Sequence, residues 1–125
     1  MAGFRSGRFS TLKNISRSTV VAERAWLART IFQRIRGLLF AKPLDRGEAL
    51  VIPSLAPQVH TFFMNYPIDV IFLNRDNCVV ALEKLEPWRI SRLYSKAVCA
   101  VELTQGAVAA SQTQVGDKIE GFGSN

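Results

Sequence analysis

The stretch from Val59 to Asn74, VHTFFMNYPIDVIFLN, constrains the fold of this chain more than any other. Val70 to Leu73 form an unbroken apolar run that follows a corner marked by Pro67. A short continuous apolar run between turn residues predicts a strand that is buried on both faces. Residues 59–64 predict a second strand before the corner, so we expect a strand, a bend and a strand, with most of the polar chemistry near the bend.

Short apolar segments bounded by Gly, Pro, Asn and Asp recur along the whole chain, and they do not alternate regularly with helices. This pattern is typical of a small all-β sheet rather than of a parallel α/β fold. We predict a mainly β fold with an α+β leaning: a small antiparallel β-sandwich or barrel with one amphipathic helix and one short helix. The expected strands are residues 18–23, 50–52, 59–64, 70–73, 78–85, 97–103 and 118–120, and the expected helices are residues 28–39 and 105–112.

A chain of 125 residues with 48% hydrophobic and 21% charged residues is expected to form one domain around one core. We predict a single globular β-rich domain over residues 18–125. Residues 1–17 are rich in Gly, Ser and Arg and are expected to be a disordered basic tail or to add a short edge strand.

Alternation on the strand at 97–103 should place Cys99 and Val101 on one face and Glu102 on the other.

The net charge of +6 is concentrated in the N-terminal third, where residues 1–46 contain ten basic and two acidic residues. Arg29 and Arg36 would share one face of the predicted helix and form a weak nucleic-acid contact surface. No helix-turn-helix, zinc-finger or aromatic RNA-binding motif accompanies them. Non-specific nucleic-acid association is therefore the least favoured of the functions considered.

Several other classes of protein are not expected. The longest apolar run, residues 97–101, is too short to span a membrane, and no apolar segment typical of a secretory signal follows the basic N-terminus, so we expect a cytoplasmic location. Cys78 and Cys99 lack the spacing of a zinc site, and no cofactor is expected. Both are expected to be buried free thiols, with a disulfide between them left open.

The candidate site gathers around the predicted bend. His60 is the only histidine and would serve as a general base or as one metal ligand. Asp69 precedes a buried strand, and there a carboxylate commonly accepts backbone N–H groups. The aromatic and thioether cluster at residues 62–66 would be core or, on one face, an exposed apolar patch. The full set of candidate ligand-binding residues is His60, Thr61, Met64, Tyr66, Asp69, Tyr94, Ser95 and Glu102.

Five segments taken in order resemble a known family: RGLLF at 36–40, HTFFMNYPIDVIFLN at 60–74, Tyr94-Ser95, AVELTQG at 100–106 and VGD at 115–117. The order resembles the domain of unknown function 192 family over about residues 18–122. That resemblance implies a compact β-rich domain and no established reaction. This chain departs from many members in its polar basic N-terminus and in Phe63, where many carry tryptophan.

These observations favour a non-enzymatic ligand- or peptide-binding accessory module with a groove around residues 60–69. Its partner would be a small molecule or an extended peptide, and its oligomeric state is left open. The alternative is a small hydrolase or metal-dependent enzyme that uses His60 with Asp69 or Glu102, although no nucleophile elbow of the G-x-S-x-G type is present. Convergence of these side chains in a cleft would favour the enzyme.

Overall fold

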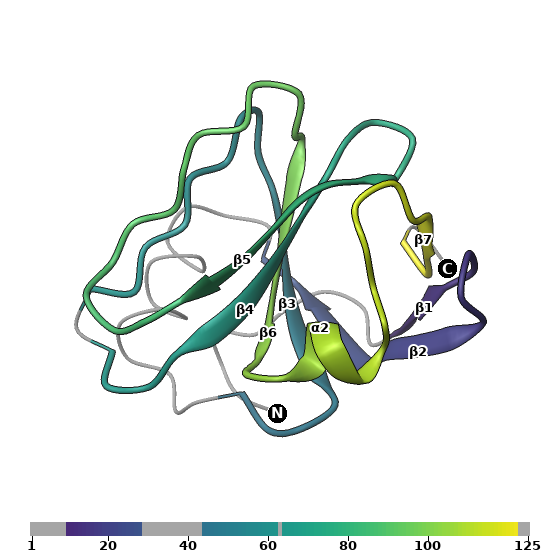
Figure 1. Ribbon diagram of the computed structural model, residues 1–125, viewed down its shortest axis with the longest axis horizontal. Helices are drawn as coiled ribbons and strands as arrows, with labels where there is room; N and C mark the ends of the chain where they lie inside the picture. The colour runs from purple at the N-terminus through teal and green to yellow at the C-terminus, as the bar shows by residue number, and fades with distance from the viewer. Residues whose placement is uncertain (1–9, 29–43, 63, 123–125) are drawn as a thin grey trace.

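The computed structural model of this protein describes residues 10–28, 44–62 and 64–122. These residues form one curled sheet that resembles half of a barrel, with the strand order β5-β4-β6-β3-β2-β1-β7 (Figure 1). The short helix α2, Ala107–Ala110, lies near one end of β2, β4 and β6. The strands are β1 Ser10–Asn14, β2 Thr19–Leu27, β3 Glu48–Pro53, β4 Ile68–Leu73, β5 Val79–Leu85, β6 Cys99–Thr104 and β7 Ile119–Glu120.

The prediction of a mainly β fold is confirmed, with one difference in the sheet. Neighbouring strands are antiparallel except for β2 and β3, which are parallel. A parallel pair needs a long connection, and residues 28–47 supply it here. The amphipathic helix predicted for residues 28–39 falls almost entirely outside the described residues. No helix in the described ranges is long and apolar enough to cross a membrane.

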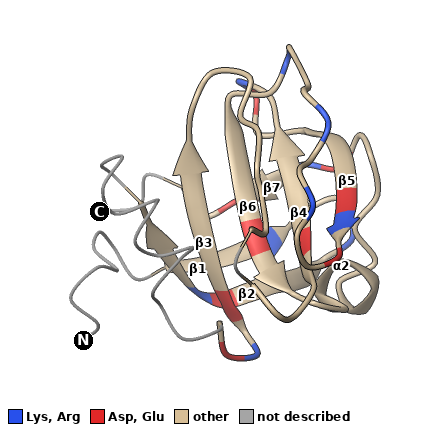
Figure 2. Ribbon diagram, turned by 90° about the vertical axis from the view of Figure 1, so that its left-hand side faces the viewer, with Lys and Arg blue, Asp and Glu red and all other residues tan. Residues whose placement is uncertain are grey.

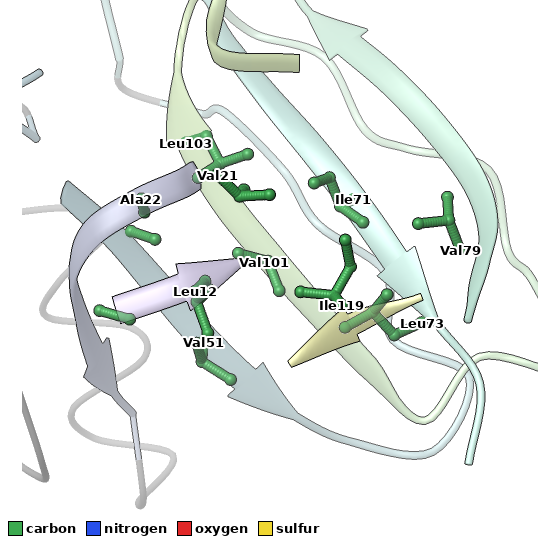
Figure 3. Packing of buried hydrophobic residues seen from close by; sticks show 12 residues of the cluster. Leu12, Val21, Ala22, Val51, Ile71, Leu73, Val79, Val101, Leu103 and Ile119 are labelled. Carbon is green, nitrogen blue, oxygen red and sulfur yellow. The ribbon is translucent and has the colours of Figure 1, made fainter. Parts of the chain in front are cut away.

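β4 is buried along its whole length, as its continuous apolar run predicted. Ile71 and Leu73 point into the larger core inside the curl of the sheet, where residues of the other strands meet them (Figure 3). Val70 and Phe72 point to the opposite face and form a second core with residues of the long loops. β6 alternates in the same way, with Val101 in the first core and the adjacent Ala100 in the second, so the expected division of faces at 97–103 is confirmed.

The strand predicted for residues 59–64 is wrong. The described part of this segment makes only an isolated antiparallel bridge between His60 and Ile90. Two local features prevent a regular ladder. The N–H of Met64 turns back to the carbonyl of Thr61 at 3.1 Å, and Trp88 on the facing segment has a φ of 61°, which breaks the extended geometry. The segment is therefore an irregular loop on the second core.

Polar contacts join the first described strand to the C-terminal segment. The buried Asn14 donates its Nδ2 to Thr113 Oγ1 at 3.1 Å and to Asp117 Oδ2 at 2.9 Å. Arg17 Nε also donates to Asp117 Oδ2, at 3.0 Å. These donors hold the pKa of Asp117 at about 2, because they stabilise its ionised form. The short strand considered for residues 1–17 is present as β1, and it lies between β2 and β7 rather than at the edge of the sheet.

Gly121 should be the glycine most sensitive to substitution at this end of the sheet. Its φ is 122°, and an added Cβ would collide with the carbonyl oxygen of Thr11 on β1. We expect Gly121→Ala to lower the free energy of unfolding by about 2 kcal/mol, measured by urea denaturation. Gly116→Ala is the matched control, since its φ is 96° but an added Cβ has nothing within 4 Å. Equal losses for both variants would contradict the collision.

A candidate binding surface on two paired loops

Two loops that are far apart in the sequence lie side by side over one face of the sheet. We call them the loop ribbon, residues 54–62 and 88–98 (Figure 1). Backbone hydrogen bonds join them at both ends, from Ser54 N–H to the Val98 carbonyl at 3.0 Å and from Thr61 N–H to the Arg89 carbonyl at 2.8 Å. The ribbon is therefore a braced element of the fold, and its outward side chains have defined positions.

Thr61 is the main brace of the ribbon, which explains why this predicted site residue is fully buried. Its Oγ1 donates to the carbonyl of Glu86 at 2.6 Å and accepts the N–H of Arg89 at 2.9 Å. Ser91 acts similarly, accepting the N–H of Val59 on Oγ at 3.0 Å. Because Val59, Thr61 and Ser91 point inward, their neighbours on both loops are turned toward solvent.

Four of these neighbours form a contiguous surface that we call the aromatic surface: His60, Phe62, Trp88 and Ile90. The rings of His60 and Phe62 stack with their centroids 4.8 Å apart, and those of Phe62 and Trp88 lie 6.2 Å apart. His60 and Ile90 are directly bridged. Trp88 is 55% exposed and Ile90 53% exposed, so the surface faces water. Leu55 and Leu93 are also exposed, further along the same ribbon.

His60 takes part in this surface as a ring and as a local acceptor. Its Nδ1 accepts the N–H of Phe62 at 3.3 Å. No carboxylate among the described residues hydrogen-bonds to His60, and no described group of three His, Cys, Asp or Glu side chains converges in a way that could hold a metal ion. The histidine is thus placed as an aromatic member of a surface rather than as the centre of a polar cluster.

Asp69 has a structural role at the start of β4, the strand that follows the bend. Its Oδ2 accepts the N–H of Gly106 at 3.1 Å and the N–H of Val108 at 3.0 Å, at the start of α2. The expectation that this carboxylate accepts backbone N–H groups is confirmed, although the donors come from α2 and not from the bend. Asp69 also borders an open cavity of about 310 Å³ with Leu82 and Lys84, and Gly106 lines both this cavity and a second one of about 450 Å³.

Glu102 is buried in the middle of the sheet, with Leu50 and Val70 as its register neighbours on either side. Its Oε2 has no hydrogen-bond partner among the described residues. Burial in this apolar setting raises the pKa of Glu102 to about 8, because the charged form cannot be solvated there. Glu102 therefore meets neither His60 nor Asp69 through any described hydrogen bond or ion pair.

The remaining predicted residues divide between core and surface. Met64 is buried and Tyr66 packs on the same second core. Tyr94 donates its hydroxyl to Glu83 Oε2 at 2.6 Å, and burial with this carboxylate raises its pKa to about 12. Ser95 is exposed. Arg29 and Arg36 lie outside the described residues, so the nucleic-acid surface stays a prediction.

Five exposed or half-exposed residues of the ribbon were not predicted as binding residues from the sequence: Phe62, Trp88, Ile90, Leu55 and Leu93. The segment Trp88 to Leu93, WRISRL, mixes large apolar and basic residues in a region with no strand period. This mixture of apolar and basic residues is the feature of the sequence that could have indicated a binding surface. The cysteines have no part in this surface: both are free, and burial raises the pKa of the Cys99 thiol to about 12.

The sequence of this chain is similar to one protein family and to several individual proteins. The sequence profile of the domain of unknown function 192 family, described as an uncharacterized ACR, matches residues 12–121. A UPF0127 protein of Thermococcus sibiricus is 32% identical over 87% of this chain and 73% of its own length. A UPF0127 protein of Pyrococcus furiosus is 34% identical over 86% of this chain and 94% of its own length.

Two crystal structures share the fold. A protein of unknown function from Novosphingobium aromaticivorans superposes with a TM-score of 0.73 at 24% identity, covering 90% of this chain and 83% of the other. A protein from Sinorhizobium meliloti, named as a candidate transcription regulator, superposes with a TM-score of 0.76 at 21% identity, covering 95% of this chain and 98% of the other. At these identities the likeness shows the fold alone.

Proposed function

Because this chain belongs to the uncharacterized domain of unknown function 192 family, we propose its function from its own surface: a non-enzymatic binding module that contacts its partner through the loop ribbon. The observation that carries this proposal is the aromatic surface. Trp88 and Ile90 are each more than half exposed, beside the stacked rings of His60 and Phe62. A contiguous exposed patch of this kind is a common mark of an interaction site.

The bracing of the ribbon supports the same proposal. Thr61 and Ser91 are themselves buried, and their hydrogen bonds fix the outward residues before any partner arrives. A preorganised surface loses little conformational entropy on binding, so more of the contact energy is available for affinity. Aromatic residues also lose few rotamers, which makes Trp88 and Phe62 suitable anchors.

The enzyme alternative, a hydrolase or metal-dependent reaction of His60 with Asp69 or Glu102, gains less support. Asp69 Oδ2 is used by two backbone donors at α2, while Glu102 lies inside the sheet between Leu50 and Val70. His60 stands on the ribbon. Nucleophilic catalysis needs a nucleophile and a base within hydrogen-bond reach of each other, and these three residues are engaged separately.

The nucleic-acid alternative rests on the basic N-terminal third, including Arg29 and Arg36. It predicts binding that weakens steeply with salt and is lost when residues 1–9 are deleted, a truncation that keeps β1 in the sheet. The name carried by the Sinorhizobium meliloti protein does not add to this reading, since 21% identity relates the folds and not the activities.

A thermal-shift screen tests the proposal with the double variant Trp88→Ser/Ile90→Ser. Both residues are more than half exposed, so the variant should fold with a Tm within a few degrees of wild type. We expect some of the short peptides or amphiphiles in the screen to raise the Tm of the wild type, and the double variant to lose at least tenfold in affinity for them.

The matched control is Val20→Ser/Val115→Ser, which removes two apolar side chains that are 49% and 62% exposed elsewhere. It should bind like the wild type. A Tm rise specific to a divalent metal and abolished by His60→Ala would instead support the enzyme. Ligands that stabilise the wild type and the ribbon variant equally would contradict the proposed surface.

A further inference from the structure

We propose that the partner of the loop ribbon is the surface of an anionic lipid bilayer, an inference that rests on the binding function proposed above. Such a bilayer is complementary to two properties of the ribbon. Its exposed apolar side chains fit the boundary between headgroups and acyl chains, and its basic side chains fit the anionic headgroups. A bilayer is the partner that presents both as a continuous plane.

The charge of the ribbon differs from that of the rest of the domain. The described residues include ten basic and ten acidic side chains, but residues 54–62 and 88–98 carry Arg89, Arg92 and Lys96 and no acid. All three basic residues are exposed. Basic residues are seen along the loop that leads into β6 (Figure 2). The ribbon is therefore locally cationic, and the remainder of the described domain has an equal excess of acid.

The nearby carboxylates do not cancel this charge. Glu83 Oε2 accepts the backbone N–H of Arg92 at 2.9 Å as well as the Tyr94 hydroxyl, so it is directed to the base of the ribbon. Glu86 lies at the end of the ribbon and pairs with Lys84 at 3.5 Å. Apart from a hydrogen bond of 3.4 Å from Arg89 Nη1 to the Trp88 carbonyl, no described hydrogen bond or ion pair engages the guanidinium and ammonium groups of the ribbon, so they are available to an external anion.

Apolar and basic residues alternate within one short segment. Trp88, Arg89 and Ile90 are consecutive, and Arg92 and Leu93 are adjacent. Leu93 is 62% exposed, and Leu55 on the facing loop is 77% exposed. A tryptophan with neighbouring arginines is the combination enriched where proteins meet the headgroup layer. Such a surface inserts shallowly and needs no cavity.

A peptide partner fits the geometry less well. Peptides usually occupy a groove or extend a sheet edge, where pockets receive alternate side chains. Two cavities among the described residues, of about 310 Å³ and 450 Å³, border α2 and share Gln105 and Gly106, and no residue of the ribbon lines either of these two. An acidic peptide is accordingly kept as an outcome of the test.

Vesicle sedimentation of the full chain tests this inference. We expect the protein to sediment with vesicles of phosphatidylcholine and phosphatidylglycerol, and not with phosphatidylcholine alone. Each basic residue near a charged bilayer contributes about fivefold to the partition coefficient, so Arg89→Gln/Arg92→Gln/Lys96→Gln should reduce it about a hundredfold. Trp88→Ser/Ile90→Ser should reduce it at least tenfold. In the Trp26→Phe variant, the fluorescence of Trp88 should shift to shorter wavelength on the vesicles.

The matched control is Arg46→Gln/Arg75→Gln/Lys118→Gln, which removes the same charge from exposed positions outside the ribbon. It should leave binding within about threefold of wild type. Equal losses in both triple variants, or binding lost only when residues 1–9 are deleted, would overturn the assignment to the ribbon. Failure to sediment would overturn the bilayer as partner. The binding function would still stand if an acidic peptide raised the Tm of wild type and not of Trp88→Ser/Ile90→Ser.

Discussion

Glu102→Gln should make this protein more stable at alkaline pH and leave it nearly unchanged at pH 5. The buried carboxyl has its pKa raised from 4.5 to about 8. In the folded wild type it stays protonated between these values, whereas in the unfolded chain it ionises. The unfolded state then binds fewer protons than the folded state, so the free energy of unfolding falls as pH rises through this window.

The full effect of such a shift is on the order of 5 kcal/mol, at about 1.4 kcal/mol for each pH unit. Gln cannot ionise, so the variant should lose this decline and exceed the wild type by several kcal/mol at pH 8.5. The measurement is urea denaturation of both proteins from pH 5 to 8.5. Asp117, with its pKa lowered to about 2, loses its stabilising contribution only in acid, and Cys99 acts only at higher pH. Parallel curves for the two proteins would show that Glu102 is not the buried acid described.

Asp69→Ala should lower the free energy of unfolding by about 3 kcal/mol, because two backbone donors lose one charged acceptor. Asp69 Oδ2 receives the N–H groups of Gly106 and Val108, and a hydrogen bond to a charged group contributes roughly 1.5–3 kcal/mol. The amide protons of these two residues should also exchange faster, since their partner is gone.

Asp69→Asn is the matched control for Asp69→Ala. Its amide oxygen can occupy the same position without the charge, so about half of the loss should be recovered. Urea denaturation gives the free energies, and amide exchange measured by NMR gives the local effect. If Asp69→Ala is as stable as wild type, Asp69 is not a structural residue. A role in ligand binding at the adjoining cavity would then be favoured.

The sequence predicted those parts of the fold whose signal is local. The apolar run at Val70 to Leu73 predicted a strand with two buried faces. The alternation at 97–103 predicted that Val101 and Glu102 lie on opposite faces of the sheet. The strands predicted at 70–73 and 78–85 are present as β4 and β5, and they pair antiparallel. Each of these is decided by neighbours along the chain.

The features that the sequence did not reveal depend on contacts between distant segments. Thr61 bonds to residues 25 to 28 positions away, and these contacts hold the irregular loop against the facing segment. Asn14 meets Asp117 across 103 positions. The candidate site was only partly anticipated for the same reason: the partner of His60 is Ile90 on the second loop, and no local pattern joins them.

Hydroxyl-radical footprinting in a cell lysate that retains its membranes would test the central claim most directly, because it works whatever the chemical nature of the partner. Leu55, Trp88, Ile90 and Leu93 on the ribbon are compared with Ile15, Val20 and Val115, which are exposed elsewhere. Binding through the loop ribbon predicts that the first group is oxidised several-fold more slowly in lysate than in buffer while the second group is unchanged. Equal oxidation of the two groups under both conditions would contradict it.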